Sequence, residues 1–211
     1  MSTRTKAQRR DDVIGLLGVY GIVCKLSPGH IDQCVEMARD EVFCNIFSAY
    51  KHLFKVSATY AHGDSWPSGY MGLAGRRYVV DGANNRRARY INPGNLPMFK
   101  KNTRIAGTTT QPILYLANKT FLFYPTSVSM VIETYKMPAP MASAAESATD
   151  TMPMQSEPYI ARGAMERALK MMVDEKTALE LTEAELAQID QAQRNFYLEM
   201  AESNLDELVK D

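Results

Sequence analysis

Three histidines are the first residues to test for chemistry, because imidazole is the side chain that most often moves protons or binds metals near neutral pH. His30, His52 and His62 stand far apart, without the HExxH spacing of a zinc site and without a nearby carboxylate pair in a repeated motif. Isolated histidines are more often structural than catalytic. The sequence therefore predicts neither a metal site nor histidine catalysis.

Glycine and serine gather in "GDSWPSGYMGLAG", from Gly63 to Gly75. The stretch lacks the GK[ST] ending of a phosphate loop and the GxGxxG spacing of a dinucleotide site. Ser65 and Ser68 lack the GxSxG context of an activated serine, and no cysteine stands in a protease signature. We expect a turn-rich surface loop here, no cofactor and no enzyme.

A basic stretch in the middle of the chain is the candidate basic surface. Its arginines and lysines are interleaved with Tyr78 and Tyr90, an arrangement able to contact phosphates. No known nucleic-acid-binding module orders them, which favours a solvated sheet face or a surface for an anionic partner. The candidates are Arg76, Arg77, Arg86, Arg87, Arg89, Lys100, Lys101 and Arg104.

Methionines mark a long passage rich in proline, alanine and serine. Met137, Met141, Met152 and Met154 lie in or beside the segment from Pro138 to Glu157, which has few other large apolar residues. Flexible thioethers suit either an adaptable protein contact or the filling of gaps in the chain's own core. We expect a mobile loop, or an arm that becomes ordered on a partner.

Charge is balanced overall and uneven along the chain. Lysine plus arginine and aspartate plus glutamate number 24 each, which argues against a general binder of nucleic acid or membranes. From Asp174 onward the chain carries eleven acidic and three basic residues, a net charge of −8, so the preceding part carries +8. This predicts either a solvated helix face or a head-to-tail contact between identical copies.

Composition places the chain among globular proteins. It has 211 residues, 45% of them hydrophobic, and its longest apolar run, "VIGLLGVYGIVC", is too short to span a membrane. The basic start "MSTRTKAQRRDD" is interrupted by two aspartates and lacks a cleavage site, so we expect an intracellular protein. Cys24, Cys34 and Cys44 are expected to be buried thiols.

Helices are expected at both ends of the chain. Ser27 and Pro28 are typical of a helix start, and apolar residues then recur at steps of three and four to about Tyr50. A less regular helix, with Gly15 among its glycines, lies between residues 5 and 25. Pro158 begins a third helix, with a stripe of Ile160, Ala164, Ala168 and Met172, and "TEAE" at 182–185 is a capping box for the last.

Strand periodicity fills the middle of the chain. "RRYVVDG" and "RRARYIN" predict one hairpin, and "ILYLA" and "TFLFYP" predict another with its turn at Asn118 and Lys119. Between them "NPGNLPMFKKN" predicts a short helical turn. Alternation over 128–135 predicts a half-buried strand, or an edge strand with two mixed faces.

The expected fold class is α+β. We expect N-terminal helices over 1–53, a β-rich insertion over 54–136 that is antiparallel, an extended arm or loop over 137–157, and C-terminal helices over 158–211. The helices of the two ends must find each other to bury their apolar stripes, which makes a helical bundle with the β region inserted between its halves.

The carboxyl-terminal half resembles the head-to-tail adaptors of tailed bacteriophages, also called connector or head-completion proteins. Three stretches match the family's pattern loosely: "ETYKMPAP" as a strand end, "MPMQSEPYIARGAMERALKMM" as a helix start, and "QAQRNFYLEM" as a helix with an aromatic pair. The glycine-rich first helix and the loop from Gly63 to Gly75 depart from the pattern. The matching residues are Tyr135, Pro138, Pro158, Tyr159, Phe196 and Tyr197.

That resemblance implies a structural virion protein of the neck, assembled in the host cytoplasm. It implies a dodecameric ring of copies that binds the portal protein and other neck or tail proteins, with packaged double-stranded DNA passing transiently through its lumen and no contact with a membrane. In this reading the passage 137–156 is the partner-contact arm, and its deletion over 142–151 should leave a folded monomer that cannot assemble.

Two alternatives remain open from the sequence, besides an enzyme of unrecognised class, for which no constellation of nucleophile, base and orienting group is found. One is another neck or tail-tube protein of the same virion. The other is a nucleic-acid-binding accessory protein that uses the region from Arg76 to Arg104, for which a steep loss of DNA affinity with salt is the distinguishing property.

Overall fold

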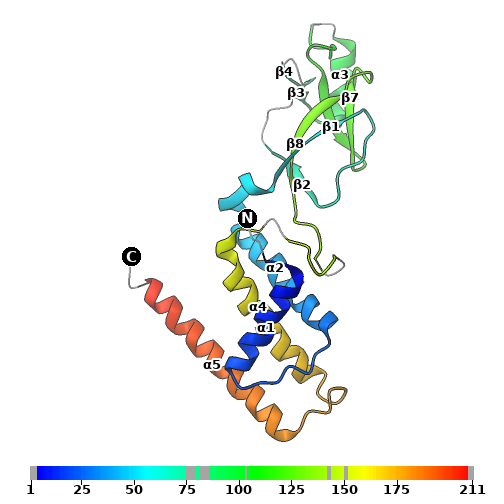
Figure 1. The fold of residues 1–211 in the computed structure, drawn as a ribbon. Helices are drawn as coiled ribbons and strands as arrows, with labels where there is room; N and C mark the ends of the chain where they lie inside the picture. Colours follow the sequence, from blue (N-terminus) through cyan, green and yellow to red (C-terminus); the bar gives the residue numbers. More distant parts are fainter. Residues whose placement is uncertain are drawn as a thin grey trace. The chain divides into compact units, whose positions relative to one another are not determined.

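The protein is described by a computed structural model that covers residues 4–74, 79–80, 86–102, 104–141, 144–149 and 152–208, without the side chains of 79, 80, 86, 87 and 200–208. The chain divides into two compact units. The helical unit comprises Met1–Ser48 and Pro140–Asp211, and the β unit comprises Ala49–Ala139. Helices from both chain ends with a β-rich insertion between them confirm the predicted α+β class (Figure 1).

The helical unit opens with helix α1, Lys6–Val19, and helix α2, Pro28–Tyr50. Thr5 and Gln8 form a reciprocal capping box at the start of α1. The predicted start of α2 is confirmed, since the Ser27 hydroxyl accepts the His30 backbone N–H at 3.3 Å. Together these caps fix where both helices begin.

The carboxyl-terminal part of the helical unit contains α4, Glu157–Asp174, and α5, Glu183–Leu208. The predicted stripe of α4 is buried in full. The predicted capping box is also confirmed, because the Thr182 backbone N–H donates to Glu185 at 2.8 Å and the Glu185 N–H to the Thr182 hydroxyl at 3.3 Å. Helix α4 lies against α1 on one side and α5 on another (Figure 1).

Part of the passage before α4 is folded onto α1 and α2. The backbone N–H groups of Lys6 and Ala7 donate to the carbonyls of Ala148 and Glu146, at 3.1 and 3.2 Å. The Met141 N–H donates to the Glu36 carboxylate at 2.8 Å, and the short helix η3, Met154–Ser156, leads into α4. These hydrogen bonds join the described part of the passage to its own helical unit, whereas the sequence favoured a mobile loop or an arm that becomes ordered on a partner.

The β unit begins with the short helix η1, Lys51–Phe54, and contains two sheets. In the first, strand β8, Met130–Lys136, pairs along one edge with β1, Lys55–Tyr60. Its other edge pairs with β2, Tyr70–Leu73, and β3, Val79–Val80. Strand β3 pairs antiparallel with β4, Arg86–Arg87, as the predicted hairpin requires.

The second sheet has the order β5-β6-β7, with bounds Arg89–Tyr90, Ile113–Ala117 and Thr120–Tyr124. Strand β5 runs parallel to β6, so the expectation of an antiparallel β region is wrong for this pair. Strands β6 and β7 form the predicted tight hairpin, in which Asn118 and Lys119 have φ of 51° and 58°. The predicted helical turn between β5 and β6 comprises η2, Pro93–Asn95, and α3, Leu96–Lys101.

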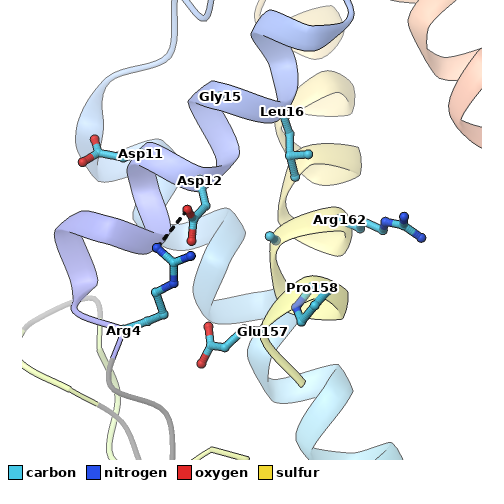
Figure 2. Close-up of a pocket in the computed structure, with 9 residues that line it drawn as sticks. Arg4, Asp11, Asp12, Gly15, Leu16, Glu157, Pro158 and Arg162 are labelled. Carbon is cyan, nitrogen blue, oxygen red and sulfur yellow. Dashed lines mark ion pairs between the residues drawn. The ribbon is translucent and has the colours of Figure 1, made fainter. Parts of the chain in front are cut away.

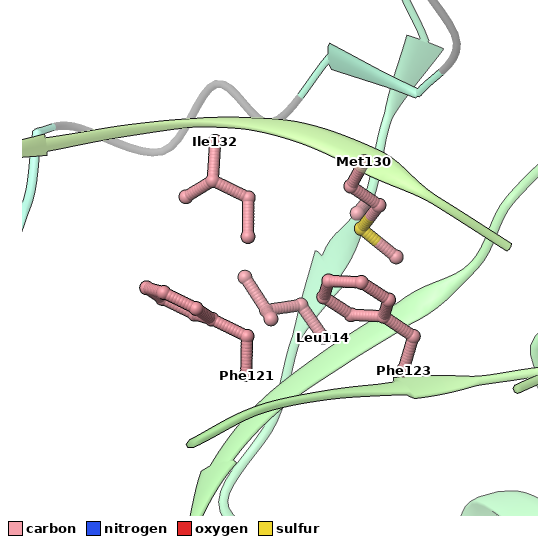
Figure 3. Packing of buried hydrophobic residues seen from close by; sticks show 6 residues of the cluster. Leu114, Phe121, Phe123, Met130 and Ile132 are labelled. Atoms are coloured by element: carbon pink, nitrogen blue, oxygen red, sulfur yellow. The ribbon is translucent and has the colours of Figure 1, made fainter. Parts of the chain in front are cut away.

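A hydrophobic core lies between the strands of the β unit (Figure 3). Met130 and Ile132 of β8 face Leu114 of β6 and Phe121 and Phe123 of β7. The alternation predicted for β8 is confirmed, because its even-numbered residues from 130 to 134 are buried.

The stretch from Gly63 to Gly75 corrects the expectation of a surface loop. Residues 70–73 form strand β2, and Trp66, Tyr70 and Leu73 pack against the core of the β unit. The rings of Trp66 and Tyr70 lie with centroids 4.4 Å apart. Aromatic side chains therefore anchor a glycine-rich segment whose composition alone is typical of a loop.

The cysteines differ in exposure. All three are free thiols, as predicted, and Cys34 is buried, which raises its pKa to about 11. Cys24 is half-buried and Cys44 is exposed, so the expectation that every cysteine is buried holds in full for Cys34 alone and is wrong for Cys44.

Candidate partner-contact surfaces

The histidines have structural surroundings. His62 Nδ1 accepts the Phe123 backbone N–H at 2.9 Å, which ties a turn of the β unit to strand β7. His30 lies 3.5 Å from a Glu175 carboxylate oxygen, and the His52 ring lies beside Tyr50. Within the described residues no three His, Cys, Asp or Glu side chains gather as a metal site would require.

Basic side chains of α1 organise the helical unit. Arg10 donates two hydrogen bonds to the Asp32 carboxylate, at 3.0 and 2.8 Å, and one to Glu146 at 3.0 Å. Lys6 lies 3.1 Å from the same Asp32 carboxylate and donates to the Ala144 carbonyl. The hydrogen bond with Asp32 raises the pKa of Arg10 above its usual value.

Sequence analysis did not identify this network, although its basic residues lie in the basic start of the chain, "MSTRTKAQRRDD". The carboxylates that Arg10 binds belong to Asp32, 22 positions along the chain, and Glu146, 136 positions along. No local sequence pattern links such distant partners. The network holds α1, α2 and the segment around Glu146 together.

The four candidate methionines do not form one surface. Met141 and Met152 are buried, the latter completely, and Met137 is half-buried at the end of β8. Met154 is 64% exposed. Met141 and Met152 therefore fill the chain's own core, one of the two roles expected from the sequence, and Met154 remains accessible to a partner.

A groove of about 500 Å³ lies between α1 and α4 (Figure 2). Its walls include Gly15 and Leu16 of α1 and Pro158 and Ala161 of α4, with Arg162 at its edge. Two of its carboxylates are neutralised by arginines, Asp12 by Arg4 at 3.3 Å and Glu157 by Arg9 at 2.6 Å. Beside these charged groups and the Asp11 carboxylate, the groove presents the small and apolar surfaces of α1 and α4.

The uncovered surface continues along α1. A Cβ atom at Gly15 or Gly18 would meet no atom within 4 Å, and Val19 is 79% exposed. A second hollow of about 290 Å³ lies beyond, between Val19 and Tyr20 on one side and residues of α5 on the other. We call this surface, from the groove at Gly15 to the hollow at Val19, the outer face of α1.

The candidate basic surface is described in part. Arg76 and Arg77 lie outside the described residues, and Arg86 and Arg87 are described only as the backbone of β4. The other four candidates are exposed and come from β5, α3 and the loop after α3. They are Arg89, Lys100, Lys101 and Arg104.

Charge separates between the two units more completely than along the sequence. The β unit, Ala49–Ala139, contains twelve basic and three acidic residues, so its net charge is +9. The helical unit contains the remaining twelve basic and 21 acidic residues, a net charge of −9. A neutral chain thus combines a strongly basic unit with a strongly acidic one.

Comparison of the sequence with protein-family models and with curated proteins finds no match. Among the helices of the described residues, none has the length and apolar character needed to cross a membrane.

Proposed function

We propose that this chain is a head-to-tail adaptor of a tailed bacteriophage, whose copies form a ring beneath the portal and join the capsid to the tail. The observation that carries the proposal is the uncovered outer face of α1 on a helical unit built from both ends of the chain. A ring is closed by a heterologous contact, in which each copy offers one surface to a different surface of the next.

The geometry of the outer face supports a protein contact. Gly15 and Gly18 let another backbone approach closely, while Ile14 and Val19 supply exposed apolar area beside them. The groove at one end of this face and the hollow at the other are recesses that side chains of a neighbouring copy can fill. A helix that buries Val13 and Leu17 inward and exposes these residues outward is suited to lie between two copies.

The passage before α4 has a different place in this proposal from the one expected from the sequence. Because Met141 and Met152 are buried in the helical unit, residues 141–152 cannot serve as a free arm without losing that packing. Exposed side chains lie where η3 leads into α4: Met154 of η3 and Tyr159 in the first turn of α4. We assign partner contact to this end of the passage.

The test is quantitative peptide mass spectrometry of purified particles of the phage that encodes the chain, with the portal protein as the internal standard. A copy ratio near one to the portal protein is the expected result for an adaptor ring. A ratio well above one would assign the chain to a tail tube, which repeats along the tail. Absence from the particles would overturn the virion proposal.

A further inference from the structure

Four exposed basic side chains of the β unit lie around α3. Arg89 of β5 donates to the Ile105 carbonyl at 3.1 Å and its guanidinium lies over the Phe99 ring of α3, 5.7 Å from the centroid. Lys100 of α3 lies 5.2 Å from the centroid of the Tyr124 ring. We call Arg89, Lys100, Lys101 and Arg104 the α3 basic cluster.

The α3 basic cluster has no carboxylates near it in sequence. From Gly82 to Ile132 the chain contains no aspartate or glutamate, but seven lysines and arginines. Of the three acidic residues of the β unit, Glu133 pairs with Lys55 at 2.6 Å and Asp64 accepts the Ala61 N–H at 2.7 Å, and Asp81 lies outside the described residues. Among the described residues, no carboxylate pairs with any of the four cations.

This pattern contrasts with the helical unit, where basic side chains are mostly neutralised. Arg10, Lys25, Arg167, Lys170 and Arg194 each lie within 4 Å of a carboxylate. The excess positive charge of the chain is therefore concentrated on the β unit, where it is available to an external polyanion.

We propose that the α3 basic cluster binds the phosphate backbone of double-stranded DNA without reading its base sequence. Lysine and arginine contacts to phosphate dominate such binding, and amide and hydroxyl side chains add to it. Asn92, Asn95, Asn102 and Thr108 are exposed on the same elements and the loops that join them. Helix α3 has six residues, about 9 Å, which is too short to lie along a major groove as a recognition helix does.

The acidic helical unit of a second copy is the competing partner, and the described contacts favour DNA over it. Carboxylates on and beside α5 are already engaged: Glu185 with Lys25, Asp190 with Arg194, and Glu199 with the Tyr20 hydroxyl. Pairing within the unit weakens the attraction of these three carboxylates for the α3 basic cluster, whereas each phosphate of a DNA backbone carries an accessible negative charge.

The inference does not rest on the adaptor proposal. A neck protein that surrounds packaged DNA and an accessory protein that binds nucleic acid would both use the same basic surface. The experiment therefore uses the isolated full-length protein, so that its failure would leave the ring proposal standing.

The test is fluorescence anisotropy of a labelled 30-base-pair duplex, titrated with the full-length protein between 50 and 200 mM NaCl. Four phosphate contacts predict a slope of about −3.6 for the logarithm of the association constant against the logarithm of the salt concentration. In the double variant Lys100→Gln, Lys101→Gln the slope should be shallower by about 2, with affinity at 50 mM at least about tenfold lower.

The matched control is Lys51→Gln with Lys119→Gln, which removes the same charge from the β unit. Lys119 lies in the β6–β7 turn. Lys100 lies over the Tyr124 ring, which is at the opposite end of the same hairpin. The control should bind DNA within about twofold of the unmodified protein, since it leaves all four contacts in place. Trp66 fluorescence verifies that each variant keeps the folded β unit.

Three results would overturn the proposal. One is no DNA binding at 50 mM NaCl with 100 μM protein. Another is an equal loss of affinity in both double variants, which would show a diffuse charge effect. The last is self-association of a protein that does not bind DNA. If sedimentation velocity showed that this self-association is salt-sensitive and is lost in the Lys100→Gln, Lys101→Gln variant, the cluster would be assigned to a second copy.

Discussion

At the residue scale, Arg9 and Glu157 join α1 to α4 through two hydrogen bonds, of 3.0 and 2.6 Å, at a site largely closed to water. Their side chains are 3% and 12% exposed. Replacing Arg9 by methionine keeps much of its volume and leaves the Glu157 carboxylate buried without this partner. We expect Arg9→Met to lower the free energy of unfolding by about 3 to 5 kcal/mol, measured by urea titration followed by far-ultraviolet circular dichroism.

Arg194→Met is the control for this prediction. Arg194 and Asp190 form an ion pair on α5 with side chains that are 69% and 59% exposed, and such pairs contribute little because water screens them. Its effect should stay within about 0.5 kcal/mol. Equal costs for the two variants would contradict a special role for the buried pair.

Glu185 gives a prediction on pH. Its hydrogen bond with Lys25, together with those from Thr182, lowers the pKa of Glu185 to about 2. A depressed folded-state pKa contributes stability that is present above the ordinary value of about 4.3 and is lost as the pH falls toward 2. The difference in melting temperature between the unmodified protein and Glu185→Gln should therefore shrink as the pH falls from 5 to 2. A difference that is constant over this range would contradict the assignment.

At the scale of elements, the passage before α4 contains two methionines of opposite exposure. Met152 is completely buried, whereas Met154, two residues later, is 64% exposed. Because truncation of a buried methionine removes its packing and leaves a cavity, Met152→Ala should cost about 2 to 5 kcal/mol, and Met154→Ala less than about 0.5 kcal/mol. Thermal unfolding at 222 nm measures both. If Met152→Ala were as harmless as its neighbour, the passage would not be part of the helical core.

Gly107 shows how closely two elements of the β unit approach. A Cβ atom at this position would overlap the Tyr124 carbonyl oxygen and lie 3.2 Å from Ile113. Gly107→Ala must move the backbone of β7, and we expect a loss of about 1 to 3 kcal/mol, followed by the fluorescence of Trp66, the single tryptophan of the chain. Gly94→Ala is the control, because its nearest neighbour would lie at an ordinary 3.6 Å. Gly107→Ala should have a lower free energy of unfolding than Gly94→Ala, and equal values would contradict the close approach at Gly107.

Elements with local start and stop signals were predictable from the sequence. Helix caps and tight turns depend on residues within a few positions of one another, so their patterns can be read directly from the sequence. Examples are the helix starts at Ser27–Pro28 and Thr182–Glu185 and the turn at Asn118–Lys119. The packing of Trp66 on the core and the pairing of Arg10 with Glu146 join residues far apart in sequence, and no local periodicity encodes them. The same limit explains why the candidate methionines were grouped together although their exposures differ.

At the scale of the whole molecule, the two proposals assign different surfaces to the two units. We propose the uncovered outer face of α1, on the helical unit of net charge −9, for a protein neighbour, and the α3 basic cluster, on the β unit of net charge +9, for DNA. Mutations can test the two proposals separately. Lys100→Gln with Lys101→Gln should impair DNA binding and leave the contact between copies intact, and a change on the outer face of α1 should do the reverse.

Gly15 is the position for that last change. A Cβ atom there would meet no atom within 4 Å, and the groove of about 500 Å³ beside it has room for an indole. We therefore expect Gly15→Trp to leave the monomer folded while its side chain fills the groove between α1 and α4. Gly15→Ala is the matched control, expected to stabilise α1 by about 0.5 to 1 kcal/mol without occupying the groove. In a complementation assay with a phage lacking the protein, tailed particles are counted by electron microscopy. They should fall at least about tenfold for Gly15→Trp, taking a contact weakened by about 1.4 kcal/mol, which is tenfold in its association constant, and stay unchanged for Gly15→Ala. Full complementation by a folded Gly15→Trp protein would show that no neighbour occupies the groove, and the contact between copies would then have to be sought on another face.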